Sequence, residues 1–138
     1  MPENNEIQVS NNDDNMAFNI PNGYICTLDA STQGGKLAIA KALNGSSPLK
    51  NEMDKPLELA GVITTPGTRA VSNTPCTNNY MALADGTVLF SQSDGVTRSL
   101  KVIVALWGEG MRNGEPVKVK CIAQTLNNGN TLKTIVPA

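Results

Sequence analysis

The chain has 138 residues, a net charge of −1, 12 Gly and 8 Pro but only 4% aromatic side chains, so it fits one β-rich domain with many turns rather than a helical bundle. It contains no histidine, which excludes catalysis by a nucleophile with a histidine base. Its three cysteines lie far apart with no C-x-x-C pair, so neither a zinc site nor a disulfide framework is expected.

The first 15 residues form an acidic, asparagine-rich segment with four acids and no base: Glu3, Glu6, Asp13 and Asp14. The rest of the chain carries all 11 basic residues and 8 acidic ones, a net charge of +3. Residues 1–15 cannot bury enough apolar surface to order themselves, so they are predicted to be a flexible acidic tail before a single domain over residues 16–138. Two interpretations of the tail stay open: it is inert, or it docks onto a neighbouring protomer and supports self-association.

The domain is predicted to begin with one extended segment and one helix. Residues 17–28 are expected to be extended, with a break at Pro21. Residues 32–44 predict a helix that stops at Asn44-Gly45, and its apolar face is expected to contain Leu37, Ile39, Ala40 and Leu43.

A strand and a long loop are predicted next. Residues 57–65 alternate in polarity, as a strand does, and Gly61 in their middle predicts a bulge that lets this strand serve two halves of a barrel. Residues 66–78 are predicted to form a polar loop in which Arg69 is the only charge. Loops of this length in a compact domain are usually functional or mobile.

Residues 79–92 predict a β-hairpin whose turn is Asp85-Gly86. A two-residue type I′ turn would place one set of side chains on the core face: Met81, Leu83, Val88 and Phe90. Tyr80 would then lie opposite Ser91 on the other, partly polar face.

Residues 93–108 predict a helix with Ser93 or Asp94 as its N-cap and Gly108 at its end. Its apolar stripe is expected to contain Val96, Leu100, Ile103 and Trp107. Arg98 and Lys101 lie off this stripe, one helical turn apart.

Residues 116–126 and 131–137 predict a second hairpin around the turn "NNGN". Its polar face is expected to present Lys118, Lys120 and Gln124, with Lys133 opposite Gln124. The predicted fold is therefore mainly β: a five-stranded oligonucleotide/oligosaccharide-binding (OB) Greek-key barrel with a helix between strands 3 and 4, plus an N-terminal strand and helix extension.

Enzymatic chemistry is not expected. The sequence has no G-x-S-x-G, P-loop or G-x-G-x-x-G motif, and no carboxylate pair suited to acid and base catalysis, so we predict a protein that is not an enzyme and uses no cofactor or metal. No apolar run approaches the roughly 20 residues that span a bilayer, and residues 1–14 lack the features of a signal peptide. A cytoplasmic protein with no membrane partner is expected.

Binding of single-stranded nucleic acid needs cations that neutralise phosphates and aromatic faces on which bases stack. Tyr80 is the stacking candidate, with packing beneath the N-terminal extension as the alternative. Four residues are the first candidates for phosphate contacts: Arg69, Lys118, Lys120 and Lys133. Arg98 and Lys101 rank below them because the helix of an OB barrel often lies away from the ligand face.

Three stretches, "KALNG…PLKNEMDKPLELAGVITTPGTR", "CTNNYMALADGTVLFSQSDGVTRSL" and "CIAQTLNNGNTLKTIVP", resemble the small single-stranded DNA-binding proteins of phages and conjugative elements of Gram-positive bacteria. The resemblance covers residues 36–137, and "FSQSDGVTRS" is its most specific part. It implies an OB fold that coats single-stranded DNA with little sequence specificity during replication or transfer. It also marks the loop at Arg69 and the hairpin from Tyr80 to Ser93, including Ser91 and Gln92, as the contact region.

Two alternatives accompany this expectation. RNA stays open as a second ligand. The rival function is that of a structural β-barrel protein of a phage or other assembly, which would use the same hairpins to pack against protein and would bind no nucleic acid.

Overall fold

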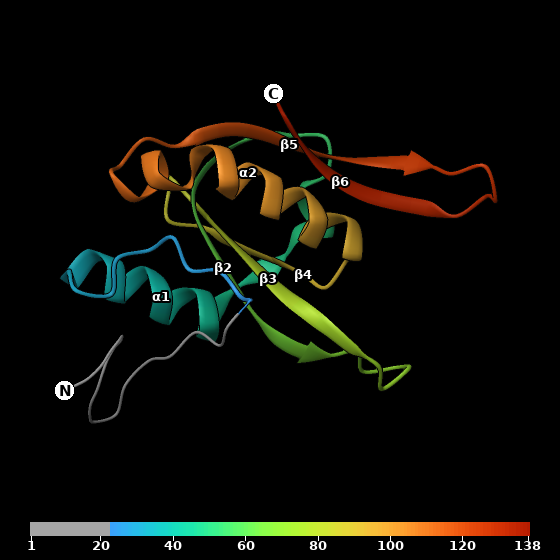
Figure 1. Ribbon diagram of the computed structural model, residues 1–138, viewed down its shortest axis with the longest axis horizontal. Coiled ribbons are helices and arrows are strands. Elements are labelled where there is room, and N and C mark those ends of the chain that lie inside the picture. The colour runs from blue at the N-terminus through green and yellow to red at the C-terminus, as the bar shows by residue number, and fades with distance from the viewer. Residues whose placement is uncertain (1–22) are drawn as a thin grey trace.

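The structure is a computed structural model that describes residues 23–138 (Figure 1). The predictions for residues 1–15 and for the first part of the extended segment, residues 17–22, lie outside the described residues.

The described chain forms two α-helices, one short 3-10 helix and six strands: α1 (Gln33–Gly45), β1 (Ser47–Pro48), η1 (Leu49–Glu52), β2 (Pro56–Thr68), β3 (Pro75–Leu83), β4 (Val88–Ser91), α2 (Asp94–Arg112), β5 (Val117–Thr125) and β6 (Thr131–Pro137). The strands make one mixed sheet in the order β1-β4-β3-β2-β5-β6, curled into a half-barrel (Figure 1). The prediction of a mainly β fold is confirmed. The sheet has six strands rather than the predicted five because Ser47–Pro48 pairs in parallel with β4.

The long strand β2 joins the two halves of the sheet. Its first four residues pair with β5, and from Leu59 onward it pairs with β3. The register shifts between Leu59 and Gly61, so the predicted bulge is confirmed. A Cβ at position 61 would lie 2.5 Å from the Leu28 side chain, which explains why glycine stands at the bend.

The prediction of a long loop over residues 66–78 was wrong. Strands β2 and β3 continue to Thr68 and from Pro75, which leaves only residues 69–74 as a connection. This loop is closed by backbone hydrogen bonds from Arg69 N to Thr74 O and from Asn73 N to Arg69 O, both 2.9 Å.

Both hairpins pair one residue out of the predicted register. Tyr80 lies opposite Phe90, and Ala123 lies opposite Lys133. Each turn holds three residues and ends in a glycine with positive φ, Gly86 at 92° and Gly129 at 84°, which is a type I turn followed by a bulge instead of a two-residue turn. A one-residue slip moves every side chain of one strand to the opposite face, so Phe90 leaves the predicted core face and Leu89 replaces it.

Helix α2 fills the open side of the curled sheet. No backbone pairing joins β4 to β6 among residues 23–138; instead Gly95 packs against Lys133 O, and the Ser99 hydroxyl accepts a hydrogen bond from Ile135 N at 3.1 Å. On its other side, Thr97 Oγ1 accepts a 2.8 Å bond from the Asn79 amide of β3. The first turns of α2 therefore bridge strands from both halves of the sheet.

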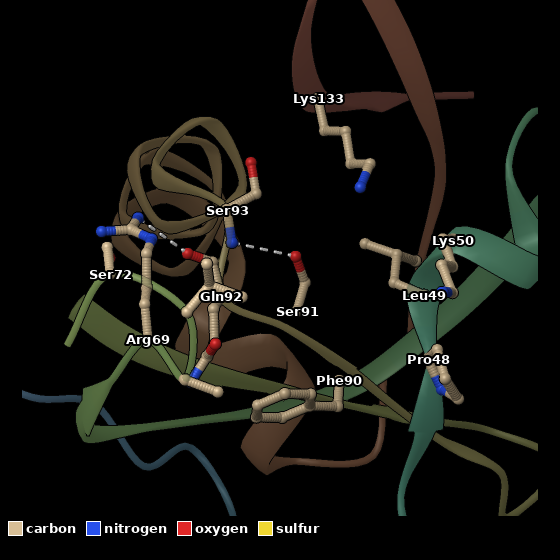
Figure 2. A pocket seen from close by; sticks show the side chains of 12 residues that line it. Pro48, Leu49, Lys50, Arg69, Ser72, Phe90, Ser91, Gln92, Ser93 and Lys133 are labelled. Carbon is tan, nitrogen blue, oxygen red and sulfur yellow. Dashed lines mark hydrogen bonds between the residues drawn. The ribbon is translucent and has the colours of Figure 1, made fainter. Parts of the chain in front are cut away.

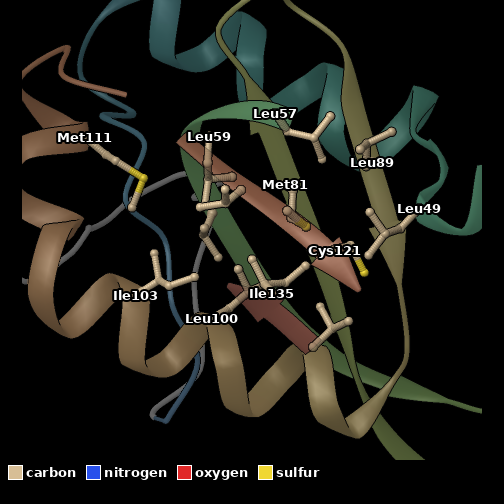
Figure 3. Close-up of a cluster of buried hydrophobic side chains, with 13 residues drawn as sticks. Leu49, Leu57, Leu59, Met81, Leu89, Leu100, Ile103, Met111, Cys121 and Ile135 are labelled. Atoms are coloured by element: carbon tan, nitrogen blue, oxygen red, sulfur yellow. The ribbon is translucent and has the colours of Figure 1, made fainter. Parts of the chain in front are cut away.

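The main core lies between α2 and the inner face of the sheet (Figure 3). Leu100 and Ile103 of α2 pack among side chains from the strands that include Leu59, Met81, Cys121 and Ile135. A second, smaller cluster lies on the outer face beneath α1 and contains Ile39, Ala42, Ile63, Ala82 and Val88.

The two helices form close to their predicted bounds, but their predicted apolar faces need correction. On α1, Ile39 is buried whereas Leu37 is 61% exposed, because the helix touches the sheet only through a narrow contact. Helix α2 runs past Gly108 to Arg112, whose guanidinium binds the carbonyls of Cys26 and Thr27 at 2.8 and 3.2 Å. Because of this contact, the face of α2 that carries Gly108 is buried, and Trp107 is left 39% exposed.

The environments of the cysteines predict the order in which they react with iodoacetamide. Burial raises the pKa of the Cys26 thiol and that of Cys121, which is fully buried, above their ordinary value, and the thiolate is the reactive form. Cys76 is half-buried on the outer face. We expect mass spectrometry at pH 8 to find Cys76 alkylated first, Cys26 later, and Cys121 only in denaturant. Modification of Cys121 as early as Cys76 would contradict the packing of β5.

Candidate functional site

A groove of about 520 Å³ lies where the 69–74 loop, the β1–η1 segment and the β4–α2 junction meet, with β6 on its far side (Figure 2). Its lining combines basic and polar side chains with apolar ones and contains a single aromatic ring: Pro48, Leu49, Lys50, Arg69, Ala70, Val71, Ser72, Phe90, Ser91, Gln92, Ser93 and Lys133. Four of these were predicted site residues: Arg69, Ser91, Gln92 and Lys133. The structure therefore gathers residues from four separate sequence segments at one surface.

Two lysines supply positive charge to the groove. Lys50 is exposed at the start of η1, where the buried Leu49 anchors the segment. Lys133 shares its face of β6 with Ile135, and its ammonium group points toward the gap between Ser91 and Leu49 (Figure 2). Within residues 23–138 neither lysine forms an ion pair, so both are available to an anion.

Arg69, a predicted phosphate contact, connects the loop that lines the groove to the start of α2. Its guanidinium donates to Gln92 O at 3.2 Å, to Asp94 Oδ1 at 2.9 Å and, more weakly, to Pro75 O at 3.4 Å. These bonds tie the 69–74 loop to the start of α2. Because the pair is partly exposed, its net stabilisation is modest, and its main effect is to hold one wall of the groove in place.

Two aromatic rings lie side by side on the outer face of the sheet. The centroids of Tyr80 and Phe90 are 5.2 Å apart and the rings are tilted by 49°, a favourable aromatic pair. Tyr80 also packs against the cluster beneath α1, which agrees with the alternative interpretation of that residue. Phe90, which the sequence placed in the core, lines the groove instead.

A buried polar residue supports the floor of the groove. Asn79 is completely buried, and its Nδ2 donates to Ser91 O at 3.0 Å and to Thr97 Oγ1 at 2.8 Å. These bonds fix the end of β4 to the first turn of α2. Its Oδ1 has no hydrogen-bond partner among the described residues.

The other four predicted cations lie outside the groove. Lys118 and Lys120 are on the first half of β5, where they pair with Glu58 and Pro56 of β2. Arg98 and Lys101 are exposed on α2. The structure does not bring these four residues together with Lys50 and Lys133.

A second hollow of about 350 Å³ has the opposite electrostatic character. Its lining contains two carboxylates and no base: Pro56, Leu57, Glu58, Leu83, Ala84 and Asp85. Hydrogen bonds from Thr87 lower the pKa of Asp85, which keeps this carboxylate charged. The charged side chains of this lining are therefore acidic, whereas the first groove contains two lysines without ion pairs among the described residues.

Sequence reasoning missed Lys50 and Phe90. Lys50 lies in a segment without periodic apolar residues, and the only local signal was Leu49, an isolated apolar residue among polar ones. Phe90 was missed because its face depends on the turn of the hairpin.

The fold and the groove define a mainly β protein with a basic, partly aromatic surface groove. The part of the chain that the structure describes contains no cluster of metal-binding side chains, and neither of its helices could cross a bilayer. The chain matches no protein-family model, no curated protein and no solved structure.

Proposed function

We propose that this protein binds single-stranded DNA and coats it with little sequence specificity. The observation that carries the proposal is the groove whose lining contains Lys50 and Lys133, both without ion pairs among residues 23–138, together with the half-buried ring of Phe90. Lysines in such a groove neutralise phosphates, and an aromatic ring in the same lining offers a face on which a base stacks.

The strand order supports an OB-type fold for the sheet. Without the two-residue β1, the order is β4-β3-β2-β5-β6, with α2 between β4 and β5 in the chain. This is the connectivity of a five-stranded OB barrel, in which the first long strand pairs with both halves. In our proposal, the contacts of α2 with the sheet replace direct backbone pairing between β4 and β6.

The contacts of the groove favour single strands and weak base readout. A ring that is half-buried in a groove reaches a base only when that base is unpaired. The Gln92 amide already donates to Asn78 Oδ1 at 2.9 Å, so the groove's one amide side chain has less capacity to select a base. In our proposal, which follows the resemblance noted above, this activity serves replication or transfer of a phage or mobile element.

The test is a titration with fluorescently labelled oligo-dT, oligo-rU and duplex DNA, followed by anisotropy at two salt concentrations. We expect oligo-dT to bind more tightly than duplex, and log K to fall with log salt by about 0.7 per neutralised phosphate. Oligo-rU decides whether RNA is also a ligand. If no oligonucleotide binds at low salt, the proposal is wrong and the rival structural role in a protein assembly gains the support.

A further inference from the structure

Three large apolar side chains of α2 are exposed to solvent. Val102 is 58%, Leu106 68% and Trp107 39% exposed, and we call these three residues the α2 patch. Val102 and Leu106 lie one helical turn apart, and Trp107 lies about 100° further around the helix. Single exposed apolar residues are ordinary, but a group within two turns of one helix that includes the chain's only tryptophan is typical of a docking surface.

Basic side chains precede the α2 patch on the same helix. Arg98 lies one turn before Val102, and Lys101 is its neighbour; both are exposed. Neither forms an ion pair with another described residue. An occupant of this surface should therefore combine apolar side chains with negative charge.

Residues 1–22 of the same chain have this composition. Asp13 and Asp14 are followed by Phe18 and Ile20, and the segment contains four acids and no base. Its net charge of −4 is opposite to the +3 of residues 23–138.

Residues 1–22 also join the described chain at a place from which they can reach the α2 patch. The carbonyls of Cys26 and Thr27 are held by Arg112, so the described chain begins close to the C-terminal end of α2. Each extended residue spans about 3.5 Å, so Phe18 and Ile20 can reach along the helix, and attachment in one chain gives an effective concentration on the order of millimolar.

We propose that Phe18 and Ile20 cover the α2 patch of their own chain, with Asp13 and Asp14 beside Arg98 and Lys101. The α2 patch includes no groove residue, so this docking is independent of DNA binding and its test needs no DNA.

Trp107 reports directly on this contact. The experiment compares acrylamide quenching and the emission maximum of Trp107 in the full chain and in the double variant Phe18→Ser/Ile20→Ser. Because the variant removes the two apolar side chains that the α2 patch would bury, we expect the undocked state to predominate and the quenching constant to rise about twofold, with emission at longer wavelength. Leu106→Ser should produce the same rise, and Leu37→Ser, an equally exposed leucine of α1, should produce none.

Three outcomes separate the proposal from its competitors. Docking within one chain is supported if the quenching constant rises in Phe18→Ser/Ile20→Ser independently of protein concentration and rises less in Asp13→Asn/Asp14→Asn. Protection of Trp107 that disappears on dilution, with a mass above the monomer in sedimentation, overturns the proposal in favour of a second copy on the α2 patch. Equal quenching in the full chain and in all variants overturns docking altogether.

Discussion

Replacing Gly95 by alanine is expected to destabilise the protein by about 3 kcal/mol, the upper part of the range for forcing an extra methyl group into a packed site. A Cβ at this position would lie 2.0 Å from Lys133 O and 2.7 Å from the Leu132 side chain. The carbonyl belongs to a paired strand and cannot move without disturbing β6. Urea unfolding followed by circular dichroism should show a lower midpoint with an unchanged slope, and the melting temperature should fall by roughly 10 °C.

The matched control is Gly34→Ala in the first turn of α1. No atom lies within 4 Å of a Cβ at that position, so the substitution should leave stability unchanged or raise it by up to about 1 kcal/mol. If Gly95→Ala were as stable as Gly34→Ala, α2 would not be seated on β6, and the half-barrel would be open at that side.

The two hairpins show why the order of the elements could be predicted while the faces of their residues could not. A glycine with positive φ after an aspartate or asparagine satisfies both a two-residue type I′ turn and a three-residue turn with a bulge. Here Asp85 Oδ1 accepts a hydrogen bond from Thr87 N at 2.9 Å, and Asn128 Oδ1 accepts one from Asn130 N at 3.0 Å. These bonds accompany the three-residue form in both turns.

The three-residue turns also determine which side chains line the groove. The one-residue slip places Phe90 beside Tyr80 on the outer face. In the second hairpin it pairs Lys133 with Ala123 instead of Gln124, which places Lys133 on the face of Cys121 and away from Lys118 and Lys120. Sequence reasoning thus identified Arg69, Ser91, Gln92 and Lys133, but the assembly of the site depended on long-range pairing.

Replacing both groove lysines, as Lys50→Gln/Lys133→Gln, is expected to weaken binding of oligo-dT about tenfold at low salt. Each exposed charge contact with a phosphate is worth up to about 1 kcal/mol, and a tenfold change corresponds to about 1.4 kcal/mol. The slope of log K against log salt should become shallower by about 1.4, since two phosphates are no longer neutralised. The measurement is the anisotropy titration with oligo-dT, repeated over a series of salt concentrations.

The matched control, Lys101→Gln/Lys118→Gln, removes the same net charge at exposed positions outside the groove. A general effect of charge would weaken binding equally in the two double variants, whereas contact in the groove predicts a large loss only for Lys50 and Lys133. Because both groove lysines lack ion pairs among residues 23–138, their replacement should not lower the unfolding midpoint in urea. Wild-type affinity and salt slope in Lys50→Gln/Lys133→Gln would place any DNA contact on another surface, even if the protein still binds single strands.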